Sequence, residues 1–244
     1  MAEPIVTMKR YELKYILTPN QTENLKEKLK GHMKVDNYGL TSIASLYYDT
    51  ADYRLIRTSI EKPDFKEKIR LRSYGLAKKG SRVFLELKRK AYGIVYKRRV
   101  PTTEEDVAKF FNYDGDICAD GQIAREISYF RGYYEKLVPA CLIIYDRLAY
   151  FEPNGDLRLT IDSNPRYRTS DLNLQTSMEG ISLLPEGYTI LEIKVQVAIP
   201  LWLTRILSEE KIYKNSFSKY GEAYKEQIKK LQGEVSYYVW FIIF

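Results

Sequence analysis

The sequence predicts an α+β fold in which an antiparallel β-sheet closes into a barrel and helices pack on its outside. At least seven stretches have the two-residue periodicity of strands, and most of them are joined by short turns that contain Gly or Pro. Several other stretches repeat apolar residues at a spacing of three to four, as amphipathic helices do. With 244 residues, 45% of them hydrophobic, the chain is long enough to bury a sizeable core.

The N-terminal half alternates strands with short helices. Thr18 suits the cap and Pro19 the first position of a helix that continues to Lys30. Residues 52–60 form a short helix or a turn, which Pro63 ends. The strands expected in this half are 10–17, 43–48, 65–74, 82–90 and 94–100. The last three follow one another closely, which predicts an antiparallel meander.

The C-terminal half begins with helices and returns to strands. One helix begins at the Thr102-Thr103 capping box, and a second follows Asp120 and carries an apolar stripe to Tyr134. Strands are expected at 140–151, 157–162 and 188–197, with a less regular segment between the second and the third. The last expected helices are residues 200–207 and a stretch that begins near Ser218.

The chain shows no linker or internal repeat, so one domain over residues 1–232 is favoured, followed by a hydrophobic tail at 233–244. The tail is shorter than the roughly 20 apolar residues of a membrane-spanning helix. It is interpreted as a last strand, a partner-docking tail or an interrupted continuation. No signal peptide is evident, and Cys141 begins an apolar run that suits a buried free thiol. A cytoplasmic, reducing location is expected.

The charge pattern is the strongest indication of function. Lys and Arg exceed Asp and Glu by 39 − 32 = 7, which favours a polyanionic partner of any class. Lys68, Arg70 and Arg72 alternate with Ile69 and Leu71, so an extended strand would have one cationic and one apolar face. A single face of this kind is normally solvated.

Repetition makes simple solvation a weaker explanation, because residues 10–15 and 84–90 show the same alternation. In a closed sheet the apolar faces would pack beneath the helices and leave the cations for the interior. Arg147, Arg158 and Lys219 add cations from the second half, and Lys68 is expected at the mouth. Among these cations, the carboxylates of Glu192 and Asp162 would bind a hard metal ion or pair with a cation.

These motifs resemble the catalytic domain of the vacuolar transporter chaperone (VTC) family, the polyphosphate polymerases among the triphosphate tunnel metalloenzymes (CYTH-like proteins). The resemblance runs from about Lys9 to Lys225, and the order and spacing of the motifs make it specific. The motifs are RYELKY (10–15), SLYYDT (45–50), KIRLRSY (68–74), FLELK (84–88), YDR (145–147), LEIK (191–194) and FSKY (217–220).

The resemblance implies an antiparallel barrel whose tunnel binds triphosphate through basic residues and one Mn²⁺ or Mg²⁺ ion. The residues expected to contact the reacting phosphates are Lys14, Arg70, Arg72, Lys88, Arg147 and Lys219. Further substrate-binding residues are Glu12, Lys97, Tyr145, Arg158 and Lys194. The expected metal ligands are Glu192 and Asp162. The run of three cations at 97–99 leaves the inward position of Lys97 ambiguous by one residue.

One departure from the pattern bears on the reaction. Hydrolytic tunnel enzymes begin with Glu-x-Glu-x-Lys, whereas this chain has Arg10 at the first of these positions, before Glu12 and Lys14. This favours transfer of phosphate from ATP to a growing inorganic polyphosphate chain over efficient hydrolysis. A tripolyphosphatase or nucleoside triphosphatase and a non-catalytic polyphosphate sensor are the alternatives. Nucleic acid is not an expected partner, and membrane association is expected only through a partner or the tail.

Overall fold

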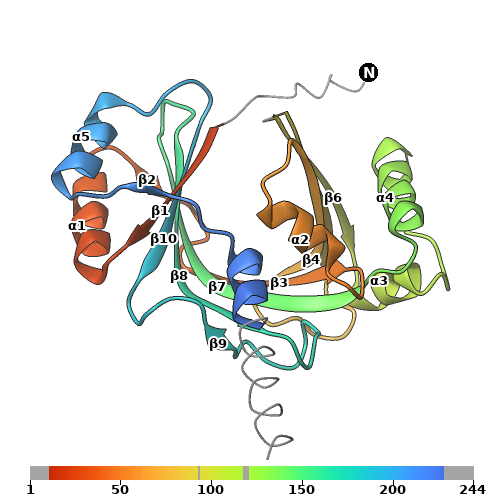
Figure 1. The fold of residues 1–244 in the computed structure, drawn as a ribbon. Helices are drawn as coiled ribbons and strands as arrows, with labels where there is room; N and C mark the ends of the chain where they lie inside the picture. Colours follow the sequence, from red (N-terminus) through yellow and green to blue (C-terminus); the bar gives the residue numbers. More distant parts are fainter. Residues whose placement is uncertain (1–10, 93, 118–120, 228–244) are drawn as a thin grey trace, which may run out of the picture.

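The computed structural model describes residues 11–92, 94–117 and 121–227 (Figure 1). These residues form one eleven-stranded antiparallel sheet and six helices, the last of which is 219–227. The sheet curls into a U, with β7 and β3 as its floor and the two ends of the sheet as facing walls (Figure 1). The predicted α+β class is confirmed. Arg10, Gly93, Cys118 and the 233–244 tail lie outside the described residues.

The longer strands are β1 (Tyr11–Leu17), β3 (Thr41–Asp49), β4 (Phe65–Tyr74), β5 (Val83–Ala91), β6 (Ile94–Thr102), β7 (Val138–Phe151), β8 (Arg158–Arg168) and β10 (Thr189–Val195). The two-residue strands are β2 (Lys34–Val35), β9 (Ile181–Ser182) and β11 (Lys214–Asn215). The labelled helices are α1 (Pro19–Leu29), α2 (Arg54–Ile60), α3 (Glu104–Phe111), α4 (Gly121–Tyr134) and α5 (Leu201–Glu209). As predicted, Thr18 caps α1 through a capping box.

The prediction of a closed barrel is wrong for the described residues. The strand order is β11-β1-β10-β8-β7-β3-β4-β5-β6, with β2 beside β7 and β9 beside β8, and no ladder joins the first strand to the last. Strand β1 pairs with β10 on one edge, and on the other edge its residues Lys14 and Tyr15 pair with β11, so part of the edge that β6 would need is already occupied. An ion pair spans the two walls instead, between Lys88 Nζ of β5 and Glu12 Oε2 of β1 at 3.0 Å.

Strand β8 extends beyond its predicted end. The sequence pattern indicates a strand only to Asp162, because the alternation of residue types breaks there. In the structure the strand continues to Arg168, and Asn164 has a left-handed φ of 47°. A register shift between Ile144 and Asp146 of β7 lies opposite this point. A local irregularity inside one strand therefore looked like the end of the strand.

Two apolar cores lie on the outer face of the sheet. Under α3 and α4, the predicted apolar positions Ile69, Leu71, Leu85 and Leu87 are completely buried, which confirms the expected packing. Under α1 and α5, a second core forms on the outer faces of β1, β8 and β10 (Figure 1). Each fully buried aliphatic side chain contributes about 1.5–3 kcal/mol. These cores leave the charged positions to line the inner face.

A third apolar cluster covers one end of the interior. The last helix places Tyr220 against Tyr47 of β3, with ring centroids 4.7 Å apart. The Tyr220 hydroxyl donates to Asp49 Oδ2 at 2.9 Å, and Asp49 also accepts from the backbone N–H groups of Leu55 and Ile56 in α2. The completely buried Asp49 carboxylate thereby joins β3, α2 and the last helix. We refer to this end as the covered end.

Candidate active site

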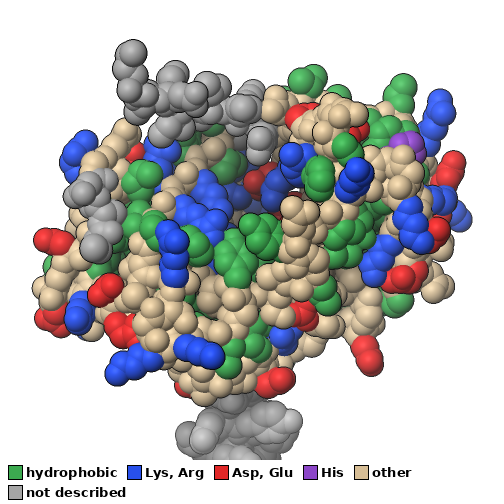
Figure 2. Space-filling model, turned by 180° about the vertical axis from the view of Figure 1, so that it is seen from behind, with side chains coloured by type: hydrophobic (Ala, Val, Ile, Leu, Met, Phe, Trp, Pro, Cys, Tyr) green, Lys and Arg blue, Asp and Glu red, His purple; other side chains and the backbone are tan. Residues whose placement is uncertain are grey.

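Charged side chains gather on the inner face of the curled sheet. Seen from behind, Lys and Arg side chains surround a hollow in which acidic side chains are visible (Figure 2). The strand register explains this, because directly opposed residues of neighbouring antiparallel strands share a face. Arg70 faces Tyr47 on β3 and Glu86 on β5, and Lys88 faces Lys97 on β6. The structure therefore resolves the ambiguity at Lys97, which lies on the inner face.

Glu86 is the centre of the wall formed by β4, β5 and β6. Its side chain is 1% exposed, and its Oε2 accepts from Arg70 Nε at 2.9 Å. Lys97 Nζ lies 2.8 Å from its Oε1. Arg72 and Arg99 approach the carboxylate at 3.7 and 3.6 Å. Burial opposes ionisation of Glu86, but Arg70, Arg72 and Lys97 outweigh it and lower its pKa to about 2.

Asp162 is the corresponding buried acid of the opposite wall. Arg147 binds it bidentately, with Nε 2.6 Å from Oδ1 and NH2 2.8 Å from Oδ2. Lys219 of the last helix donates to Oδ2 at 2.5 Å. Burial again opposes ionisation, and Lys219 and Arg147 overcome it and lower the pKa of Asp162. Both carboxylate oxygens are thus engaged with cations.

Tyr145 connects the two walls. Its hydroxyl accepts a hydrogen bond from Arg72 NH2 at 3.2 Å. Lys219 Nζ lies 4.3 Å from the centroid of its ring, and Arg147 Cζ lies 5.1 Å from the centroid. Burial would raise the pKa of Tyr145, but Arg72 and Arg147 outweigh burial and lower the pKa. Cations from β4, β7 and the last helix therefore converge on one phenol.

Glu192 lies beside a buried polar group that could still bind a ligand. It opposes Lys14 on β1 and Thr160 on β8, and Lys194 Nζ lies 3.0 Å from its Oε1. Burial opposes its ionisation, but Lys194, Lys14 and Arg147 lower its pKa. The Thr160 hydroxyl is buried and has no hydrogen-bond partner within the described ranges. Buried hydroxyls are normally paired, so this one fits a water molecule or a ligand held beside Glu192.

Most of the predicted site residues lie together. Arg158 opposes Lys194 and so shares the inner face, but it lies at the end of β8, where its exposed side chain contacts the Phe151 ring and donates to its neighbour Leu157 O. Lys68 is not at the open mouth: its Nζ contacts Ser218 Oγ at 3.3 Å, at the covered end. Those that line the interior are Lys14, Arg70, Arg72, Lys88, Lys97, Tyr145, Arg147, Asp162, Glu192, Lys194 and Lys219, with Glu12 bridging to Lys88.

Three interior residues were not predicted as site residues. Glu86 lies on the same face of β5 as Lys88, so the two-residue alternation along residues 84–90 could have predicted that Glu86 lines the interior. Tyr47 accepts a hydrogen bond from Arg70 NH1 at 2.8 Å. Neither this contact nor the unpaired Thr160 hydroxyl follows from a sequence pattern, since both depend on the register between strands.

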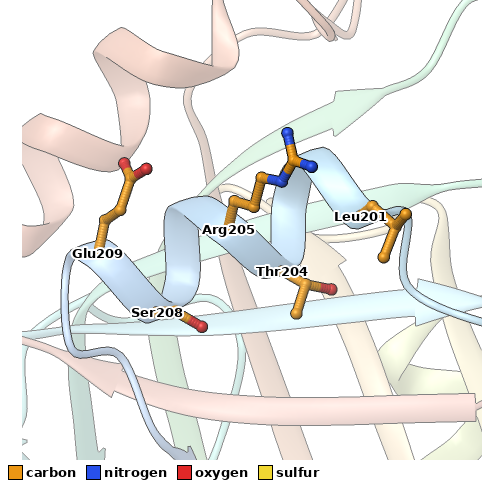
Figure 3. Close-up of a pocket in the computed structure, with 5 residues that line it drawn as sticks. All are labelled: Leu201, Thr204, Arg205, Ser208 and Glu209. Carbon is orange, nitrogen blue, oxygen red and sulfur yellow. The ribbon is translucent and has the colours of Figure 1, made fainter.

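The structure also shows a buried thiol at the covered end and a depression on the outer side of α5. In the described part of the chain, no three His, Cys, Asp or Glu residues form a metal-binding group, and the predicted buried free thiol of Cys141 is confirmed. A shallow depression of about 250 Å³ lies on the outer side of α5 (Figure 3). Its lining residues are Leu201, Thr204, Arg205, Ser208 and Glu209. The helix packs through its opposite side, so the depression has no contact with the charged interior.

Comparison with known proteins identifies the family and the fold. The family model of the VTC domain matches residues 9–227. A candidate adenylate cyclase from Bacillus halodurans is similar in structure, with a TM-score of 0.53 and 12% identity over 86% of this chain and 96% of its own. A candidate adenylyl cyclase from Hippeastrum with a dominant triphosphatase activity is also similar in structure, with a TM-score of 0.53 and 18% identity. The match covers 87% of this chain and 93% of that one. A search of curated proteins finds no match.

Proposed function

The chain belongs to the VTC domain family, and on this premise we propose that it is a metal-dependent polyphosphate polymerase. The reaction would transfer the γ-phosphate of ATP to a growing inorganic polyphosphate chain. One observation carries the proposal: Arg72, Arg147 and Lys219, from three distant parts of the sequence, converge on Tyr145 inside the sheet. The interior residues named above comprise eight cations and four carboxylates, so Glu86 and Asp162 neutralise only part of this charge and a bound polyanion would compensate the rest.

The interior residues would act by positioning and by charge. Arg70 and Arg72 present forked donors that suit phosphate oxygens, whereas Lys219 acts as a point charge. Bound phosphates would compete with Glu86 and Asp162 for these cations, because the carboxylates now hold them in place. Phosphoryl transfer needs little covalent chemistry from a protein, so no side-chain nucleophile is required.

The metal ion of the proposal is Mn²⁺ or Mg²⁺. Glu192 would hold it, and the unpaired Thr160 hydroxyl directly opposite supports this position. Asp162 stays a predicted ligand, but its two oxygens are engaged by Arg147 and Lys219, which makes Glu192 the better placed carboxylate. When bound, the ion would neutralise charge on the triphosphate.

Location and partners belong to the same proposal. ATP and inorganic polyphosphate are the proposed partners, with no nucleic acid. Among the described helices, none is long and apolar enough to cross a membrane. A cytoplasmic location, with membrane association only through a partner or the tail, stays a prediction.

A direct assay tests the polymerase. The purified chain is incubated with ATP and Mn²⁺ or Mg²⁺, and the products are resolved on a gel and by release of free phosphate. Long phosphate chains are expected. Arg72→Ala and Glu192→Gln should each abolish synthesis while the circular dichroism spectrum is retained. Full activity of either variant would refute the role given to that residue.

A triphosphatase is the second candidate. Glu12, the remaining carboxylate of the hydrolase signature, lies on the inner face of β1, 3.0 Å from Lys88. Free phosphate without chains in the same assay would establish hydrolysis and refute the polymerase. Tight polyphosphate binding without turnover would identify a sensor.

A further inference from the structure

The inner face ends in a group of aromatic and cationic side chains, which we call the rim platform. It consists of Tyr74 at the end of β4, Phe84 of β5 and Arg99 of β6. Arg99 Cζ lies 3.6 Å from the centroid of the Phe84 ring, and Arg99 NH2 donates to the Tyr74 hydroxyl at 3.0 Å. The Tyr74 and Phe84 rings meet edge to face, with centroids 6.0 Å apart. Hydrogen bonding and stacking therefore hold the three side chains as one unit.

The rim platform lies at the end of the interior opposite the covered end. Lys66 and Lys68 begin β4 and contact Ser59 O and Ser218 Oγ. Along the inner face of β4 the Arg70 side chain is 22% exposed, the Arg72 side chain is 7% exposed, and Tyr74 at the end of the strand is 50% exposed. The platform therefore forms the exposed end of the inner face of β4, next to the buried Arg72.

The platform also adjoins the cations of the proposed phosphate site. Arg72 and Phe84 are direct partners in the β4–β5 ladder, and Arg99 Nε lies 3.6 Å from Glu86 Oε1. Successive residues on one face of a strand are roughly 7 Å apart. A triphosphate held by Arg70 and Arg72 would therefore leave the nucleoside at Tyr74 and Phe84.

We propose that the rim platform is the nucleobase subsite of this chain, which stacks the base of a nucleoside triphosphate whose phosphates extend inward. The inference rests on the proposed function and predicts that the base adds affinity for a nucleoside triphosphate beyond that for inorganic tripolyphosphate. Aromatic rings and guanidinium planes both stack on bases. Stacking is tolerant of base identity, so ATP and GTP should bind with similar affinity.

Equilibrium binding measured with two ligands tests the subsite. ATP and inorganic tripolyphosphate are titrated into the wild-type chain and Tyr74→Ala at the same Mg²⁺ concentration and ionic strength. Tyr74→Ala should weaken ATP binding by ~5-fold or more. Its affinity for tripolyphosphate should stay within about twofold of wild type, because the phosphate contacts are unchanged.

Matched variants separate stacking from other effects. Tyr74→Phe keeps the ring and loses the hydroxyl, so it should bind ATP nearly as tightly as wild type. Tyr129→Ala removes an exposed tyrosine on α4, outside the interior, and should change neither affinity.

The remaining possible results of the binding measurements would each refute either the subsite or the proposed function. Unchanged ATP affinity in Tyr74→Ala, or equal losses for both ligands, would refute the nucleobase subsite. A wild-type chain that binds tripolyphosphate and not ATP would also refute it while supporting the phosphate site. A wild-type chain that binds neither ligand would refute the proposed function itself, and the subsite with it.

Discussion

The two walls of the interior use acidic residues differently. In the wall of β4, β5 and β6, four cations surround the carboxylate of Glu86, which is buried on the inner face. In the opposite wall, Asp162 is saturated by Arg147 and Lys219, but Glu192 lies beside the unpaired hydroxyl of Thr160. Glu86 Oε1 and the Thr160 hydroxyl both lack a well-aligned hydrogen bond within the described residues, but Lys97 Nζ lies 2.8 Å from Glu86 Oε1. The first wall is therefore held together by its own charges, whereas the hydroxyl of the second wall is left to bind a further polar group. A buried acid can therefore organise cations or leave room for a ligand, and its contacts distinguish the two cases.

Of the changes that test this difference between the walls, removing the Glu86 charge should have the largest effect on stability. Glu86→Gln would leave Arg70, Arg72 and Lys97 without their common anion, and losing one partner of a buried ion pair costs about 3–5 kcal/mol. The free energy of unfolding, measured by urea denaturation, should fall by that amount. The matched control is Glu23→Gln, which removes an exposed i,i+3 ion pair with Lys26. This substitution should lower the free energy of unfolding by less than about 1 kcal/mol. Equal losses in the two variants would show that Glu86 does not organise its wall.

Acid should weaken the same wall in a defined pH range. The folded-state pKa of Glu86 is about 2, below its usual value of 4.5, so its ionised form stabilises the fold above about pH 4.5. This stability is lost as the pH falls from about 4.5 to about 2, by roughly 3 kcal/mol. Urea denaturation at a series of pH values should show a smaller acid-dependent loss in Glu86→Gln than in wild type. Identical pH profiles would contradict the assignment.

The unpaired hydroxyl of the opposite wall predicts a smaller change of the opposite sign. Thr160→Val keeps the side-chain shape and removes an unsatisfied buried polar group, so the metal-free chain should become more stable by about 1 kcal/mol. The variant should also bind Mn²⁺ several-fold more weakly, as measured by titration calorimetry. A loss of stability would show that the hydroxyl is already paired in the folded chain. Unchanged Mn²⁺ affinity would show that the hydroxyl does not contribute to metal binding.

The smallest expected effect concerns a proton at the covered end. Burial lowers the pKa of Lys68 to about 8, and nearby Lys14 acts in the same direction. The unfolded chain keeps this proton up to about pH 10.5, so Lys68 makes stability rise between pH 8 and 10.5. A bound polyanion would favour the charged form and take up ~0.5 proton at pH 8.

Calorimetric titration of tripolyphosphate in two buffers of different ionisation enthalpy measures this uptake. Lys68→Gln should take up fewer protons than wild type, and this comparison cancels protons released or bound by tripolyphosphate itself. The same proton count in both chains would show that Lys68 does not sense the ligand.

Alternation along single strands allowed much of this molecule to be predicted from its sequence. The burial of Ile69 and Leu71 and the inward position of Arg72 follow from a two-residue period within one segment. Closure of the barrel could not be predicted in this way, because it depends on which edge of β1 is already occupied by β11. The partners of Glu86 and the isolation of Thr160 depend on the register across three strands, which no single segment encodes.

The contacts of the last helix also bear on the order in which the molecule forms. Lys14 donates to Phe217 O across 203 residues of sequence, and Tyr220 reaches Asp49 across 171. Contacts between such distant segments form slowly during folding, because a long loop must close first. During synthesis, Asp162 has only Arg147 as a partner until Lys219 has emerged from the ribosome. The group of charges around Asp162 is therefore incomplete until the last helix has been synthesised.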